Sequence, residues 1–161
     1  MSRSIRFSLN RISPPRVSFV DYLAMCKRLG VDSIEIRNDL PGVEMQDGAA
    51  PATIKAAAAA AGITIRSINA LYPFDIFNAD LESRATAMAK YAAQCGAEAL
   101  VMCPFNSWDD KRTPAERHAD LVKSLKSLRP ILEDNGLLGL VEPLGFQQCS
   151  LRRKSDAVKA I

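Results

Sequence analysis

One carboxylate in this sequence stands where an enzyme could use it. Residues 139–149 read GLVEPLGFQQC, so Glu142 closes a short apolar run directly before Pro143. Barrel enzymes place catalytic groups at the carboxyl ends of buried parallel strands. A buried carboxylate needs a partner, which a metal ion or a buried base would supply. We therefore predict that Glu142 belongs to a functional site, with a metal ion or a buried base as its partner. An ion pair with Arg37 across the fold is the structural alternative.

Five more polar side chains lie at or near the predicted carboxyl ends of the other strands. In a parallel barrel these ends share one rim, which makes the five side chains candidates for the same site. Asparagine also begins turns well, and this explains the three asparagines equally well. The glutamate and the arginine lie two apart on one strand, so they share a face and favour a structural ion pair. The five candidates are Asn10, Glu35, Arg37, Asn69 and Asn106.

Short apolar or alternating runs predict the strands that must position these residues, and longer stretches with helical spacing separate the runs. Glycines follow the helical stretches at Gly30, Gly62, Gly96 and Gly136, where a left-handed cap favours glycine. Strict alternation without hairpin signals predicts a parallel sheet with right-handed crossovers. We expect strands at residues 5–10, 33–37, 64–71, 98–103 and 137–142, and helices at 19–29, 51–61, 81–95 and 121–132.

Strand spacing favours a barrel over an open sheet. The predicted strands begin 28 to 39 residues apart, and an eight-unit barrel of roughly 250 residues averages about 31 per unit. A complete doubly wound sheet is the alternative, but no glycine-rich phosphate loop follows the first strand. We predict an α/β fold in which residues 1–161 form a single domain. It would be the N-terminal portion of a (β/α)8 TIM barrel, truncated to about the first five βα units.

Composition excludes several classes of protein. The chain is 48% hydrophobic and 24% charged, which is ordinary for one globular domain. A net charge of +3 is too small to favour a nucleic-acid partner. The short basic run at residues 152–154 is predicted to be a solvated helix start, with phosphate contact as the alternative. His118 lies among charged residues at a helix start, and we expect it to be exposed.

The sequence contains no recognisable targeting signal or cysteine motif. The four cysteines have neither zinc-knuckle nor redox spacing, so we expect reduced, buried thiols. The sequence contains neither a signal peptide nor an apolar run long enough for a membrane span. We therefore expect a cytoplasmic protein without a membrane partner.

Four motifs carry a resemblance to a known family. They are FSLN near the start, DSIEIRNDLP at the second strand, SINALYPFDIFN at the third and VEPLGFQQCS at the fifth. Together they resemble the sugar phosphate isomerase and epimerase branch of the xylose isomerase-like barrels. Within that branch they are most similar to the 2-keto-myo-inositol isomerases of inositol breakdown. The resemblance spans nearly the whole chain.

This resemblance implies a metal-dependent isomerase of a keto-inositol or keto-sugar. Its divalent metal (manganese, zinc, cobalt or magnesium) would be held by a glutamate on the fifth strand and by an aspartate, a histidine and a glutamate from later strands. Of these ligands only the glutamate on the fifth strand maps onto this sequence, at Glu142, which the resemblance implies is a metal ligand and a catalytic residue. The remaining ligands are absent from this chain, so we expect the activity to be incomplete. The metal would stabilise an enediolate while a carboxylate moves the proton. Asn10, Asn69 and Glu35 or Arg37 would bind substrate hydroxyls.

Other interpretations stay open at this stage. Phe146 stands where similar sequences can carry histidine, which puts the substrate contacts of the fifth loop in doubt. A sugar epimerase of the same family would use the same enediolate. A non-catalytic, truncated barrel could instead associate with a partner or with itself through open sheet edges. A DNA-repair nuclease is disfavoured, since one helical histidine supplies few metal ligands and the charge is modest.

Overall fold

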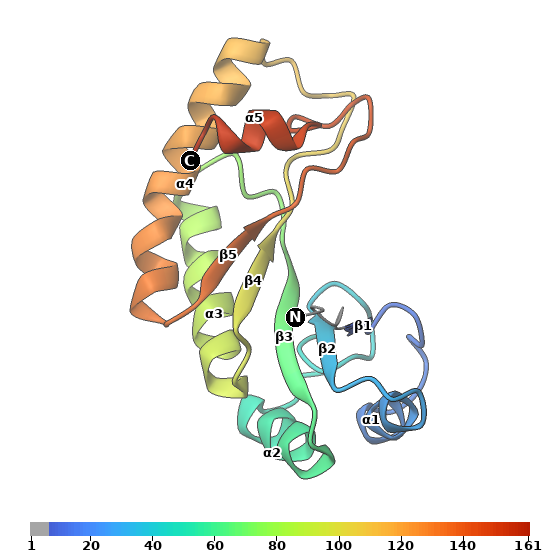
Figure 1. Cartoon of the computed structure of the whole chain (residues 1–161). Helices are drawn as coiled ribbons and strands as arrows, with labels where there is room; N and C mark the ends of the chain where they lie inside the picture. Colours follow the sequence, from blue (N-terminus) through green and yellow to red (C-terminus); the bar gives the residue numbers. More distant parts are fainter. Residues whose placement is uncertain (1–6) are drawn as a thin grey trace, which may run out of the picture.

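The computed structural model describes residues 7–161 as an alternation of strands and helices (Figure 1). The predicted first strand begins at residue 5, and its first two residues lie outside the described part of the chain. The other predicted elements are found within a few residues of their expected ends, except that the helix predicted to begin at residue 121 begins at Pro114. The elements are β1 (Leu9–Asn10), α1 (Phe19–Arg28), β2 (Ser33–Arg37), α2 (Pro51–Ala61), β3 (Thr64–Leu71), α3 (Ala79–Cys95), β4 (Ala99–Met102), α4 (Pro114–Asp134), β5 (Leu138–Val141) and α5 (Lys154–Val158).

The strands form one parallel sheet in the order β1-β2-β3-β4-β5. Each strand therefore pairs with its neighbour in sequence, as in a barrel, whereas a doubly wound sheet reverses its order at a switch point. The register places Arg37 beside Asn69 and Asn69 beside Val101. The prediction of a TIM-barrel fold over a doubly wound sheet is confirmed.

Local sequence explains where the helices end. The four predicted glycines all have positive φ, between 66° and 79°, a region that costs glycine little because it lacks a Cβ. The longest helix, α4, begins with a capping box in which Thr113 and Glu116 each bond the other's backbone. The basic run precedes and begins α5, and its side chains are exposed, which agrees with the predicted helix start.

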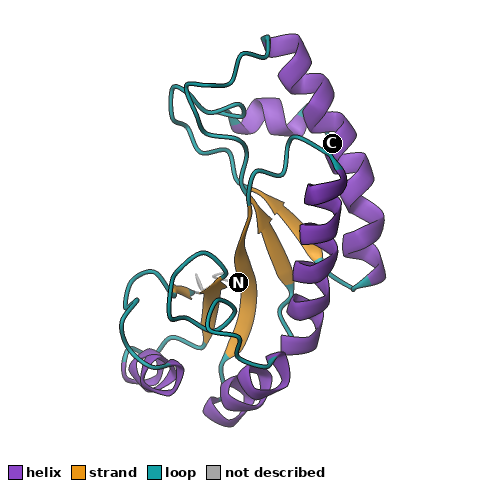
Figure 2. Cartoon of the chain, turned by 180° about the vertical axis from the view of Figure 1, so that it is seen from behind, coloured by secondary structure: helices purple, strands orange, loops and turns teal. Residues whose placement is uncertain are grey.

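The two faces of the sheet have different surroundings. Leu100 and Met102 point into the main hydrophobic core, which the helices cover; Figure 2 shows α3 and α4 along that side of the sheet. Val101 and Cys103 alternate with them and form a small cluster on the opposite, inner face. Side chains that end the strands on the inner face are therefore separated from the main core.

The last strand is more exposed than its apolar sequence predicts. Leu138 and Leu140 point away from the helices and are 67% and 45% exposed. Within the described residues β5 pairs only with β4, so one edge and the inner face of the strand meet solvent. Gly139 faces the other way, toward Leu132 and Met102, where a Cβ would lie 2.8 Å from both side chains.

A buried arginine ties the first two strand-to-helix loops together. Arg11, which follows β1 directly, is 1% exposed and its Nε donates to Glu44 at 2.8 Å. Its other nitrogens donate to the carbonyls of Pro14 at 2.5 Å and Val17 at 2.6 Å. The guanidinium also lies 5.0 Å from the centre of the Tyr22 ring. The loop after Asn10 is thus fixed to the loop after β2.

A buried aspartate does the same for the next three loops. Asp75, in the loop after β3, accepts hydrogen bonds from the Phe105 N–H at 2.7 Å and the Ser150 hydroxyl at 2.6 Å. Arg112 donates to the same carboxylate at 3.3 Å. The loops that follow β3, β4 and β5 are therefore held in one arrangement.

All four cysteines are free and buried, as predicted. Among the described helices, none is both long and apolar enough to cross a membrane.

Candidate functional site

The carboxyl edge of the sheet brings four of the predicted site residues into one hydrogen-bonded chain. Asn10 ends β1 and its amide donates to Glu35 Oε1. Asn69, on β3, donates from Nδ2 to the same oxygen at 3.3 Å. The Ser67 hydroxyl donates to Glu35 Oε2 at 2.6 Å. Glu35 thus uses both oxygens to receive donors from β1 and β3, which fixes its position.

Asn69 joins the two carboxylates of the site. Its Nδ2 also donates to Glu142 Oε2 at 3.4 Å, while the residue itself is only 9% exposed. An amide nitrogen has two hydrogens, so one can point toward each glutamate. Glu35 and Glu142 are therefore held around a shared donor, although 107 residues separate them in sequence.

The prediction that Glu142 is buried is wrong. The residue follows β5 on the inner face and is exposed, because β5 is the last strand of the described sheet and nothing within residues 7–161 covers that face of it. The burial argument for a metal partner therefore does not apply here. Among the described residues Glu142 Oε1 has no hydrogen-bond partner, whereas Oε2 takes the contacts from Asn69 and Cys103.

Cys103 supplies the second contact, with its Sγ 3.4 Å from Glu142 Oε2. Burial, and next the negative charge of Glu142, raise the pKa of the Cys103 thiol to about 12. A raised pKa favours the protonated thiol, so Cys103 is a hydrogen-bond donor to Glu142 at neutral pH and a poor nucleophile.

We expect alkylation of Cys103 by iodoacetamide at pH 8 to be at least about a hundredfold slower than that of a free thiol. The reason is that only the thiolate reacts, and the raised pKa keeps its population small. Peptide mass spectrometry across pH 7 to 10 measures the rate at each cysteine. Glu142→Gln should accelerate the alkylation of Cys103 but not that of the other cysteines, because it removes the negative charge beside the Cys103 thiol. A rate at Cys103 that matches a free thiol, or that ignores Glu142→Gln, would show that the contact is absent.

Two of the predicted site residues, Arg37 and Asn106, are not part of this series of hydrogen-bonded side chains. Arg37 was expected to pair with Glu35 or, across the fold, with Glu142; instead it makes a two-pronged ion pair with Asp39, at 2.8 and 2.5 Å. The hydrogen bond to Asp39 raises the pKa of Arg37. Arg37 pairs with Asp39 because Asp39 lies two residues later, in a loop that can turn back to the guanidinium. Glu35 is already hydrogen-bonded to Asn10 and Ser67.

Asn106 lies farther out, in the loop after β4. It forms a bridge with Cys149 and its N–H donates to the Tyr72 hydroxyl at 3.4 Å. Its Oδ1 is buried and has no hydrogen-bond partner among the described residues. The structure therefore places Asn106 in the loop assembly and not beside the two glutamates. His118, as expected, is exposed.

Sequence reasoning missed Ser67 and Cys103. Both are small residues in apolar strands and look like ordinary core positions. The available signal was spacing. Ser67 lies two residues before Asn69 on the same strand face. Cys103 is the last residue of the predicted strand 98–103, just as Glu142 is the last residue of the predicted strand 137–142.

These residues alone do not fit a complete metal centre. No group of three histidine, cysteine, aspartate or glutamate side chains within residues 7–161 could hold a metal ion. The groups nearest Glu142 are an amide nitrogen that donates and a protonated thiol, and neither suits a divalent metal without rearrangement.

Comparison with solved structures shows how widely this fold is shared. A xylose isomerase domain-containing protein from Salmonella typhimurium LT2 is 31% identical, with a TM-score of 0.88 over 97% of this chain and 56% of that one. The IolI protein, solved with a zinc atom, is 20% identical, with a TM-score of 0.86 over 98% and 58%. The 3-keto-D-glucoside 4-epimerase of E. coli is 15% identical, with a TM-score of 0.75 over 98% and 64%.

The chain thus spans 56% to 64% of the length of these three structures. A comparison with curated proteins gave no match. The sequence model of one family, described as the xylose isomerase-like TIM barrel, matches residues 23–161. That match covers four of the five strands and includes Glu35, Asn69 and Glu142. Together with the sequential parallel sheet, it establishes that this chain belongs to the xylose isomerase-like TIM barrel family.

Proposed function

We propose that the carboxyl edge of the sheet binds a polyhydroxy ketone, a keto-inositol or keto-sugar, for isomerisation through an enediolate. The observation that carries this proposal is the chain of side chains in which Asn69 joins Glu35 to Glu142. Neutral amide and hydroxyl groups beside carboxylates suit a ligand that offers many hydroxyls, each able to donate and accept. Residues 1–161 would form the N-terminal portion of the barrel.

The two carboxylates would have different roles. Glu35 is half-buried and accepts three hydrogen bonds, from Asn10, Ser67 and Asn69, so we assign it to positioning the amides that contact substrate. Glu142 is exposed on the inner face and keeps one oxygen free of hydrogen bonds from described residues. We assign to Glu142 the transfer of the proton between the carbons next to the carbonyl.

A divalent metal is part of the proposal, and one of the similar structures supports it. IolI was solved with zinc, and an exposed carboxylate such as Glu142 could serve as one ligand. The described residues do not complete a metal site, so the other ligands would have to come from outside them. When bound, such an ion would supply charge stabilisation for the enediolate.

An NMR titration of the ¹⁵N-labelled chain with 2-keto-myo-inositol tests the binding step. We expect saturable shifts at the side-chain NH₂ groups of Asn10 and Asn69. Asn135 provides an internal control, because its NH₂ donates to the Ile131 carbonyl at the end of α4. The absence of saturable shifts at Asn10 and Asn69, or equal shifts at Asn135, would contradict the proposal. If the ketone binds, analysis of the product by NMR separates isomerisation from epimerisation.

A further inference from the structure

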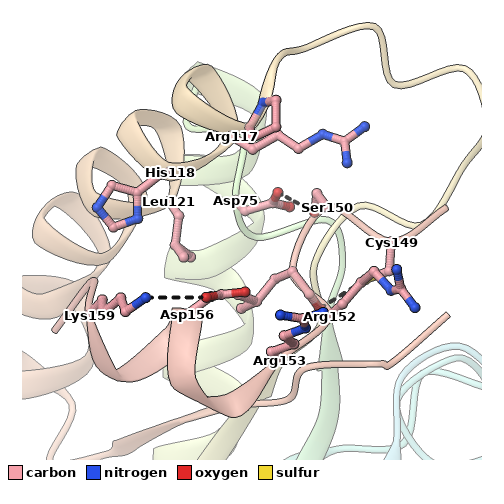
Figure 3. A pocket seen from close by; sticks show the side chains of 12 residues that line it. Asp75, Arg117, His118, Leu121, Cys149, Ser150, Arg152, Arg153, Asp156 and Lys159 are labelled. Carbon is pink, nitrogen blue, oxygen red and sulfur yellow. Dashed lines mark hydrogen bonds and ion pairs between the residues drawn. The ribbon is translucent and has the colours of Figure 1, made fainter. Parts of the chain in front are cut away.

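A cavity lies outside the candidate site, between α4 and residues 149–159 (Figure 3). Its volume is about 630 Å³, within the range of small-molecule sites. No member of the hydrogen-bonded chain of Glu35, Asn69 and Glu142 lines it. Five basic and two acidic side chains line it: Arg117, His118, Arg152, Arg153, Lys159, Asp75 and Asp156.

The acidic groups of this cavity are already neutralised. Asp75 is 1% exposed, and its carboxylate accepts hydrogen bonds from Phe105, Ser150 and Arg112. Asp156 makes a long ion pair with Lys159, at 3.9 Å. The carboxylates therefore leave little negative charge facing the cavity.

Two of the basic groups lack such partners. Neither Arg152 nor Arg153 makes an ion pair with any residue of the described chain, 7–161. Arg117 does have a partner, since its Nε lies 3.1 Å from Asp110 Oδ2 and its Nη2 donates to the Asp110 carbonyl at 3.2 Å. Unpaired guanidinium groups that share one cavity attract an anion strongly, because their repulsion falls when a negative charge lies between them.

We propose that this cavity binds a phosphate-bearing small molecule. Arg152 and Arg153 both line the cavity, and a guanidinium group matches the geometry of phosphate oxygens, which accept pairs of parallel hydrogen bonds. The amino-terminal end of the 21-residue helix α4, at Pro114, also lines the cavity and adds partial positive charge. Leu121 and Leu151 supply an apolar wall for the remainder of the ligand.

This ligand differs from the one proposed for the inner face. A phosphate group placed beside Glu35 and Glu142 would meet two carboxylates, whereas the cavity beside α4 offers excess positive charge. The inference therefore stands independently of the proposed isomerase, and the failure of either leaves the other in place.

An NMR titration of the ¹⁵N-labelled chain with inorganic phosphate at low ionic strength tests this inference. We expect saturable shifts of the backbone amides of residues 150–153. The double variant Arg152→Gln/Arg153→Gln should weaken phosphate binding at least tenfold. Lys27→Gln/Arg28→Gln is a matched control, since it removes two adjacent, exposed basic groups from the end of α1, and α1 lies far from α5 in Figure 1.

The two double variants distinguish a specific phosphate site from general attraction between phosphate and a basic surface. The control variant should retain phosphate binding within about twofold, and both variants should keep the wild-type thermal midpoint because the substituted side chains are exposed. Shifts that never saturate, or equal weakening in the two double variants, would overturn the inference.

Discussion

Arg11→Met is expected to lower the free energy of unfolding by about 3–5 kcal/mol, since it leaves a buried carboxylate without its partner. Glu44 is 2% exposed, and one of its oxygens already lacks a hydrogen bond. The substitution also removes the donors to the carbonyls of Pro14 and Val17. Small domains are stable by only about 5–15 kcal/mol, so this single change removes a large share of the total.

Two further variants identify the cause of that loss. Arg11→Met/Glu44→Leu should recover much of the stability, because removing both charges leaves no unpaired ion in the interior. Arg129→Met breaks an exposed pair with Glu133, at 2.7 Å, and should leave the urea midpoint close to that of the wild type, because exposed ion pairs contribute little to stability. Urea denaturation followed by circular dichroism measures all three. A loss of under 1 kcal/mol for Arg11→Met would mean that the buried pair does not form.

Glu142→Gln is expected to reduce isomerase turnover at least a hundredfold, as the loss of a general acid–base group does. Glutamine keeps the shape of the side chain but cannot take and return a proton. The assay follows conversion of 2-keto-myo-inositol by the protein as isolated from its native source and by the same protein carrying the substitution. It reports kcat and KM separately, so that loss of chemistry is distinguished from loss of binding.

A matched control excludes a general effect of removing a carboxylate. Glu82→Gln changes an exposed residue in the first turn of α3 and should leave kcat within about twofold. Retained turnover in Glu142→Gln would remove Glu142 from the catalytic role. An equal loss in both variants would point to altered folding.

Much of the fold was predictable because its signals are local. Helical spacing and the left-handed glycines at Gly62 and Gly96 depend on residues within one or two turns. The order of the sheet followed from the alternation of strands and helices, since right-handed crossovers leave few arrangements. The burial of β5 was predicted wrongly because apolar composition alone does not say how many neighbours a strand has.

The site was only partly predictable because it depends on register between strands. Asn10, Glu35, Asn69 and Glu142 were found from their positions at or near the carboxyl ends of the predicted strands. Their connection through one amide requires the pairing of β2 with β3 and of β3 with β4, which no local pattern encodes.

Arg37 illustrates the opposite error. The shared strand face correctly placed it near Glu35, but a loop carboxylate at Asp39 offered a two-pronged partner. The alternation of side chains along a strand predicts which residues share a face. It does not predict whether a residue on that face will pair instead with a flexible side chain in the following loop.

The most direct test of the proposed function is incorporation of deuterium from D₂O into 2-keto-myo-inositol. The measurement uses the protein as isolated from its native source, with manganese, zinc, cobalt or magnesium added in turn. Proton transfer through an enediolate predicts saturable deuterium incorporation at a carbon next to the carbonyl. Incorporation no faster than in buffer containing the ketone and metal alone would contradict the proposed function.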